Sequence, residues 1–172
     1  PAERLKNLHI TPLTISYEYD PCDYLKAKEF QQKRDNPAFK KSKQDDLDNM
    51  KTGIWGKKGH IHYQTAPCIN TWIDELAHLP KTEFFTAVAR RMDREIHRGY
   101  MLFPGNYVAL DLLNGNSAHS NRYTPADKQR FEQYLEQRIG LIDLPQKDIP
   151  FLRGKMLAMY ANPVINKEEA EG

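Results

Sequence analysis

The chain has 172 residues, 40% of them hydrophobic, so it is long enough to fold around a core and too apolar for a disordered protein. Twenty-five Lys and Arg stand against 23 Asp and Glu, and this balance excludes a partner selected by overall charge, leaving only local patches. No apolar run approaches the ~20 residues of a membrane-spanning helix. Cys22 and Cys68 match no Cys-x-x-Cys or Cys/His metal spacing, so we expect two reduced cysteines in an intracellular protein.

Two segments have the patterns of strands. Residues 10–19, ITPLTISYEY, are rich in β-branched and aromatic residues and nearly continuously apolar, which predicts a strand buried on both faces. Residues 60–66, HIHYQTA, alternate with period two and predict a second strand. Two strands alone do not make a stable sheet. Either helices cover them, or their partner strands lie in sequence that is not present here.

Most of the remaining chain has helical patterns. They cover residues 23–34, 42–54, 71–79, 81–100, 124–140 and the chain from 148 onward, with a short apolar segment over 107–113. Ser42 with Asp45, and Thr124 with Pro125 and Asp127, predict two N-terminal caps. The final NKEEAEG is predicted to fray. We therefore expect an α/β protein that is mostly helical, with two or three strands.

A search for catalytic residues finds little. His60 and His62 share one predicted strand face, but no third ligand can be named, so we expect no metal site and no cofactor. The chain has no G-x-S-x-G, no Cys/His signature and no phosphate-binding glycine loop. Glu18 and Asp20 lie at the end of the first predicted strand, where they either orient a substrate or else cap the next helix or pair with nearby lysines.

The segment Lys26 to Lys43 is the most basic part of the chain. It holds seven Lys and Arg against two acidic residues, Glu29 and Asp35, which gives a local net charge of +5. Phe30 and Phe39 lie between the basic residues. Such a segment can meet anionic lipid head groups, a substrate phosphate or nucleic acid, or it can be no more than a solvated surface.

Two stretches together resemble a known family. ITPLTISYEYDPCDYLKAKEFQQKRDNPAFKKS, followed by GHIHYQTAPCIN, resembles the later part of the glycerol-phosphate acyltransferases, a family that includes the lysophosphatidate acyltransferases, and is most similar to their bacterial relatives. The family's last conserved motif is a strand with a P-(V/L)-x-(I/V) block, which Pro12, Leu13, Thr14 and Ile15 match. A later strand ending in G-x-P-I has its counterpart in residues 66–69. The resemblance covers residues 8–98.

The family's catalytic motif is absent from this chain. In the family, the histidine of H-x-x-x-x-D acts as general base on the acceptor hydroxyl and the aspartate orients it. None of the six histidines here has an aspartate five positions on, and the phosphate-binding E-G-x-R is also missing. Both motifs precede the strand with the P-(V/L)-x-(I/V) block in the family. We therefore expect the C-terminal part of such an enzyme, with no catalytic residue of its own.

The resemblance implies further expectations. Residues 1–100 would be the C-terminal half of an acyltransferase-like α/β domain, and 101–172 a helical extension. Pro12, Leu13, Thr14 and Ile15 would lie near the acyl site, whereas Lys40 and Lys41 would face the membrane or an anionic substrate.

The implied partners are acyl-CoA or acyl-carrier protein, a lysophospholipid-like acceptor and a membrane surface, with a possible homo-oligomer and no nucleic acid. The expected location is cytoplasmic and peripheral at the inner membrane. The alternative is a non-catalytic helical binding module that uses residues 26–43 on nucleic acid or a protein.

Overall fold

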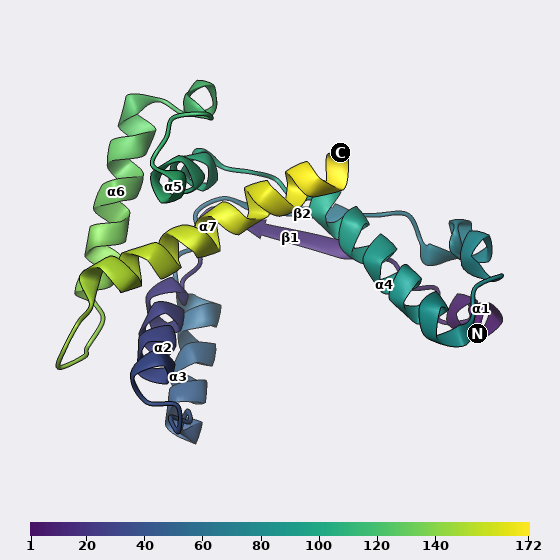
Figure 1. Cartoon of the computed structure of the whole chain (residues 1–172), viewed down its shortest axis with the longest axis horizontal. Coiled ribbons are helices and arrows are strands. Elements are labelled where there is room, and N and C mark those ends of the chain that lie inside the picture. The colour runs from purple at the N-terminus through teal and green to yellow at the C-terminus, as the bar shows by residue number, and fades with distance from the viewer. The chain divides into compact units, whose positions relative to one another are not determined.

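The computed structural model describes all 172 residues and consists of seven α-helices, three short 3-10 helices and one two-stranded antiparallel sheet (Figure 1). The mostly helical chain with two strands agrees with the sequence prediction. The chain forms two compact units: the first contains residues 1–16, 61–101 and 165–172, and the second contains residues 17–60 and 102–164. The division at residue 100 that the family resemblance implies stays a prediction.

The first unit contains the sheet and the helices around it. Its elements are α1 (Ala2–Lys6), β1 (Leu13–Tyr17, except its last residue), β2 (Ile61–Thr65), η1 (Ile69–Thr71), η2 (Ile73–Leu76), α4 (Lys81–Arg98) and the last turns of α7 (Ile149–Glu171). The helix predicted over 71–79 is therefore two 3-10 turns. The core is formed by apolar side chains of α1, η1, η2 and α4: Ala2, Ile69, Trp72, Ile73, Phe84 and Val88.

Strand β1 is buried on one face only, and the buried face is the one that carries its polar residues. Leu13 and Ile15 are 50% and 42% exposed, whereas Thr14 and Ser16 are buried. The prediction of a strand buried on both faces was wrong. A strand alternates its side chains, so only one set faces inward, and the C-terminal end of α4 lies against that set.

The contact between β1 and the end of α4 explains this choice of residues. Thr14 Oγ1 donates to the carbonyl oxygen of Ile96 (3.0 Å), and Ser16 Oγ accepts from the amide of Met101 (3.0 Å). A Cβ placed on Gly99 would lie 2.6 Å from Thr14 Oγ1, so the helix end approaches the strand closely. Short hydroxyl side chains fit this space and satisfy backbone groups that the helix end leaves unpaired.

The C-terminal segment is helical to Glu171 and does not fray, contrary to the prediction. Arg98 Nε donates to the carbonyl oxygen of Ala170 (2.7 Å), and Lys167 Nζ donates to the carbonyl oxygens of Arg98 (3.0 Å) and Tyr100 (2.7 Å). The end of α7 thus lies beside the end of α4 in the first unit (Figure 1).

The second unit is entirely helical apart from its loops. Its elements are α2 (Asp23–Asp35), α3 (Lys43–Trp55), α5 (Pro104–Asn114), η3 (Ser120–Arg122), α6 (Pro125–Gly140) and most of α7. The core is built chiefly from α5, α6 and α7, with Ala27 of α2: Ala27, Val108, Ala109, Leu110, Phe131, Leu135, Ile139, Ile142, Leu152, Met156, Leu157, Tyr160, Ala161 and Val164.

Both predicted caps are confirmed. The amide of Asp45 donates to Ser42 Oγ (3.1 Å) while the Asp45 carboxylate accepts from the amide of Ser42 (2.9 Å). Thr124 and Asp127 make the same reciprocal pair at the start of α6, with the same two distances. These bonds satisfy helix-end amides that would otherwise lack partners.

Candidate functional site

The residues predicted to bind substrate divide between the two units. Pro12, Leu13, Thr14 and Ile15 belong to the first unit and Lys40 and Lys41 to the second. Pro12 and Thr14 are buried, and Thr14 is committed to its hydrogen bond with α4. Leu13 and Ile15 are the members of the block with side chains available to a ligand.

The basic segment is partly neutralised by its own neighbours. Four of its seven basic side chains are in ion pairs: Lys26 with Asp20, Lys33 and Lys41 with Glu29, and Arg34 with Asp35 and Asp148. Burial by itself would raise the pKa of Glu29, but the two lysines outweigh it and the net pKa is lowered. Only Lys28, Lys40 and Lys43 form no ion pair, so the effective patch is smaller than the sequence charge indicates.

The two carboxylates after β1 have structural partners. Glu18 accepts from the backbone amide of His60 (3.0 Å), and its Oε2 lies 2.7 Å from His60 Nδ1. Asp20 accepts from the amide of Cys22 (2.9 Å) at the start of α2 and pairs with Lys26. Of the interpretations left open for this pair, the pairing with a nearby lysine describes Asp20, whereas the N-cap of α2 has no side-chain hydrogen bond.

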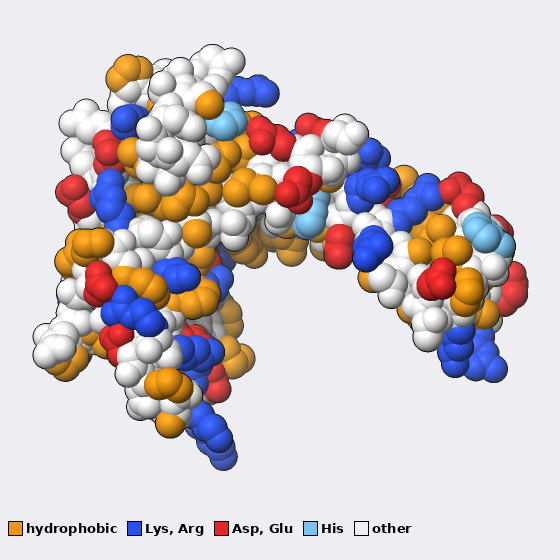
Figure 2. Space-filling view, in the orientation of Figure 1, with side chains coloured by type: hydrophobic (Ala, Val, Ile, Leu, Met, Phe, Trp, Pro, Cys, Tyr) orange, Lys and Arg blue, Asp and Glu red, His pale blue; other side chains and the backbone are white.

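Helix α3 turns its apolar side chains outward. Leu47, Met50, Ile54 and Trp55 are 50%, 62%, 65% and 77% exposed, and α3 has no buried residue. Its inner side instead carries small or polar residues against α2, where Cys22 Sγ donates to the carbonyl oxygen of Asn49 (3.4 Å). Hydrophobic side chains lie among Lys and Arg over α2 and α3 (Figure 2). This apolar ridge, residues 47, 50, 54 and 55, is the most exposed apolar feature of the second unit.

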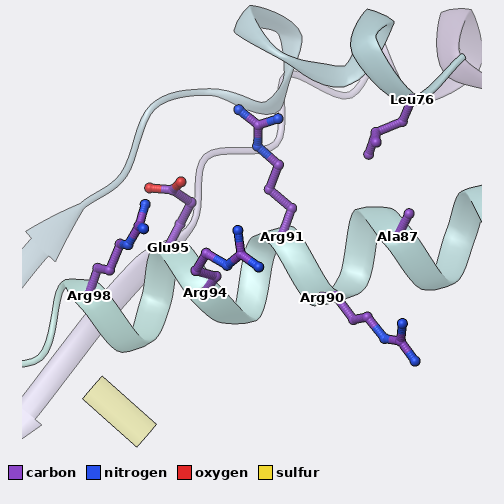
Figure 3. Close-up of a pocket in the computed structure, with 7 residues that line it drawn as sticks. All are labelled: Leu76, Ala87, Arg90, Arg91, Arg94, Glu95 and Arg98. Atoms are coloured by element: carbon purple, nitrogen blue, oxygen red, sulfur yellow. The ribbon is translucent and has the colours of Figure 1, made fainter. Parts of the chain in front are cut away.

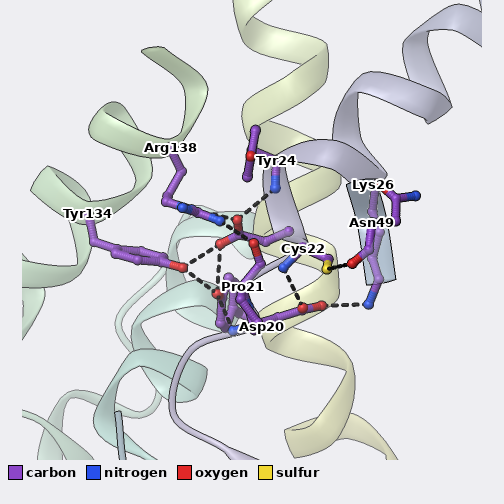
Figure 4. Close-up of polar contacts among 10 residues, drawn as sticks. Asp20, Pro21, Cys22, Tyr24, Lys26, Asn49, Tyr134 and Arg138 are labelled. Carbon is purple, nitrogen blue, oxygen red and sulfur yellow. Dashed lines mark hydrogen bonds and ion pairs between the residues drawn. The ribbon is translucent and has the colours of Figure 1, made fainter. Parts of the chain in front are cut away.

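A buried carboxylate forms the centre of the second unit. Asp23, the first residue of α2, is fully buried. Its Oδ2 accepts from the hydroxyls of Tyr134 (2.5 Å) and Tyr160 (2.8 Å), and its Oδ1 accepts from Arg138 Nε (2.7 Å) and the amide of Tyr24 (2.6 Å). Figure 4 shows Tyr134 and Arg138 of α6 pointing together at the start of α2. The cluster joins α2, α6 and α7.

The electrostatics of this cluster keep its two tyrosines and its arginine in their ordinary charge states. Burial, and then the neighbouring Asp23 carboxylate, raise the pKa of both Tyr134 and Tyr160. Burial alone would lower the pKa of Arg138, but Asp23 outweighs it and the pKa is raised. The hydroxyls therefore stay protonated donors and the guanidinium stays charged. All four side chains are engaged with one another, so the cluster holds helices together and activates no nucleophile.

A cleft of about 590 Å³ lies beside this cluster in the second unit. It is lined by Tyr19, Pro21, Tyr24, Thr52, Gly56, Lys57, Arg130, Gln133, Tyr134, Gln137, Arg138 and Leu141. The lining contains aromatic rings, amides and cations but no histidine and no carboxylate. The nearby Cys22 thiol is also a poor nucleophile, because burial and then Asp20 raise its pKa. The cleft can bind a ligand, and its lining offers no histidine or carboxylate as a general base.

No known protein family, curated protein or solved structure matches this chain. No helix combines the length and the apolar character needed to cross a bilayer.

Sequence reasoning missed three features of this structure. The side chains that donate hydrogen bonds to Asp23 lie more than 100 positions away in the sequence, and no local pattern predicts this contact. The outward direction of the α3 ridge depends on how α3 packs. The arginines of α4, at positions 90, 91, 94 and 98, did have a signal, because ARRMDREIHR places them at helical spacing.

Proposed function

We propose that this chain is part of an acyltransferase that moves an acyl group from acyl-CoA or acyl-carrier protein to a glycerophosphate-like acceptor. The support is the placement of the two segments that carry the resemblance. Ala66 N donates to the carbonyl oxygen of Pro12 (2.9 Å), and Ile69 N donates to that of Ile10 (2.9 Å). Segments over fifty residues apart thus lie side by side, with Leu13 and Ile15 exposed beside them.

The proposal assigns these residues a supporting role. Leu13 and Ile15 offer apolar surface to an acyl chain, and no residue of the chain acts as the base. The proposal therefore requires a histidine and an aspartate in the H-x-x-x-x-D spacing from sequence outside residues 1–172.

The test measures release of free CoA. The complete reading frame of the gene is expressed, and the product is incubated with lysophosphatidate or glycerol 3-phosphate and a panel of acyl-CoAs. We expect turnover from that product and none from residues 1–172 alone. A reading frame without the H-x-x-x-x-D and E-G-x-R motifs, or turnover that scales with residues 1–172 through repurification, would contradict the proposal.

We further propose that the second unit meets an anionic membrane surface through the α3 ridge. Helical geometry places Lys43 and Lys51 on the same side as Leu47, Met50 and Ile54, so the outward face carries both apolar and basic side chains. Interfacial helices combine apolar side chains that enter the acyl boundary with lysines near the head groups. A flat bilayer can cover such a convex ridge without a matching pocket.

Vesicle co-sedimentation tests this membrane contact. Changing Ile54 and Trp55 to Gln removes two exposed apolar anchors, each worth roughly 1.5 kcal/mol or more when fully buried, so binding should fall at least about tenfold. The control is Leu8→Gln, which removes from the first unit one apolar side chain that is as exposed as Ile54. Equal sedimentation of both variants would refute the role of the ridge. Binding to an oligonucleotide in place of vesicles would favour the alternative of a nucleic-acid module.

A further inference from the structure

Four arginines line one groove in the first unit. Arg90, Arg91, Arg94 and Arg98 of α4 border a cavity of about 490 Å³ together with Leu76 of η2, Ala87 and Glu95. Arg90, Arg94 and Arg98 are spaced four residues apart, which places them about one helical turn from one another on one side of the helix. Figure 3 shows Arg91, Arg94 and Arg98 directed to the side of α4 that faces η2, while Arg90, at the edge of the groove, points in the opposite direction.

The arginines of this groove differ in what they contact. Arg91 is occupied, because its guanidinium pairs with Glu75 and lies over the Trp72 ring, 4.7 Å from the centroid. Arg98 is anchored by its Nε, which donates to the carbonyl oxygen of Ala170, so its two terminal nitrogens keep their donors free. Arg94 has no hydrogen-bond or ion-pair partner.

Arg90 also lacks such a partner, so three of the four guanidinium groups can still donate. Glu95 is the only carboxylate that lines the groove. The lining therefore has four positive charges against one negative charge, and with the Arg91–Glu75 pair set aside the excess is still two. Ordinary surface arginines have carboxylates in reach, as Arg34 does. The groove therefore carries a net positive charge and can bind an anion.

We propose that the groove binds a phosphomonoester dianion, with Arg94 and Arg98 as its main ligands and Arg90 at the rim. A guanidinium presents two parallel N–H donors that match two phosphate oxygens, and such charge-assisted pairs are the strong hydrogen bonds of proteins. Leu76 and Ala87 supply an apolar wall for the organic part of the ester. The inference is independent of acyl transfer, since it concerns binding by this chain alone.

Calorimetric titration with glycerol 3-phosphate and with inorganic phosphate tests the site. We expect a dissociation constant on the order of 1 mM or tighter for glycerol 3-phosphate and a loss of about tenfold in Arg94→Gln. Arg94→Lys keeps the positive charge but removes the two parallel N–H donors of the guanidinium, and we expect this variant to bind more weakly as well. Arg4→Gln is the matched control, because it removes one exposed arginine of the same unit away from the groove and should bind like the parent.

The arginine Nε–Hε signals in a nitrogen–proton correlation spectrum report the location independently. Saturating glycerol 3-phosphate should shift the Arg94 and Arg98 signals and leave the Arg4 signal in place. Thermal unfolding of each variant by circular dichroism confirms that it is folded before it is titrated.

Vesicles of phosphatidylcholine with and without phosphatidic acid distinguish a lipid from a soluble source of the phosphate. Binding that depends on both phosphatidic acid and Arg94, with weak binding of the soluble esters, supports the site with a lipid head group as its ligand. Absence of both kinds of binding, an Arg94→Lys variant equal to the parent, or equal losses in Arg94→Gln and Arg4→Gln would overturn it. None of these outcomes depends on CoA release, so the acyltransferase proposal stands or fails separately.

Discussion

Replacing Asp23 with Asn should destabilise the second unit severely. The substitution preserves the shape of the side chain but removes the negative charge that holds Arg138, Tyr134 and Tyr160 around it. Arg138 would keep its positive charge in a partly buried position without a counter-charge. The new amide group would also present donors where the surrounding groups are donors already.

The magnitude follows from burial. Asp23 is fully buried, and removing one partner of a buried ion pair costs about 3–5 kcal/mol because the other charge stays desolvated and unpaired. The matched control is Asp20→Asn, three residues away, which breaks the exposed pair with Lys26. Exposed pairs contribute about 0–1 kcal/mol, so the two substitutions should differ severalfold in cost.

Urea unfolding followed by far-ultraviolet circular dichroism measures both variants. With a slope of about 2 kcal/mol per molar urea, Asp23→Asn should lower the midpoint by roughly 1.5–2.5 M and Asp20→Asn by less than about 0.5 M. The double variant Asp23→Leu with Arg138→Met removes both charges and should recover much of the loss. A midpoint for Asp23→Asn close to that of Asp20→Asn would show that the carboxylate is not the electrostatic centre of the unit.

Three further predictions concern local features. Thr124→Ala should lower the free energy of unfolding by about 1 kcal/mol near neutral pH. Hydrogen bonds from the Thr124 hydroxyl and amide lower the pKa of Asp127, so the stability that this carboxylate contributes is present above its ordinary pKa. Unfolding measured as a function of pH should show that this contribution disappears below about pH 4. Gly99→Ala should cost about 1–3 kcal/mol because its Cβ would meet Thr14, whereas Gly140→Ala, with open space around it, should show no such cost in thermal unfolding. Ile15→Lys should fold normally because Ile15 is exposed. If the outward sheet face joins two copies of the chain, the parent should associate in sedimentation velocity and this variant should stay monomeric. Association of both proteins would exclude that face as the interface.

The features that the sequence predicts are those decided within a few residues. The capping boxes of Ser42 and Thr124 depend on side chains three positions apart, and both are present in the structure. The strand over residues 61–65 follows from alternation alone. Local chemistry is sufficient in these places because the competing conformations lack the same bonds.

The direction in which an element faces depends on distant parts of the chain. Nothing within residues 10–19 indicates that Thr14 and Ser16, rather than Leu13 and Ile15, face the covering helix. That outcome is set by the close approach of Gly99, more than eighty residues later, which leaves room only for short side chains. Composition predicted the strand, and tertiary packing selected its inner face.

The candidate sites show the same division. The basic character of residues 26–43 is visible in the sequence. Its partial neutralisation is not, because Arg34 pairs with Asp148, which lies 114 positions later in the chain. The α4 arginines could be found from their spacing. Their availability could not, because it depends on which carboxylates the fold brings near.

The order of the two units along the sequence has a consequence for folding during synthesis on the ribosome. The first unit begins with residues 1–16 and is completed by residues 165–172, whereas every residue of the second unit lies between them. Domains generally fold as units while the N-terminal parts emerge first. The second unit can thus complete its core once Val164 has left the ribosome. The core of the first unit, which lies between Ala2 and Val88, has by then already been synthesised, and only the contact between Arg98 and the backbone of Ala170 waits for the C-terminal residues.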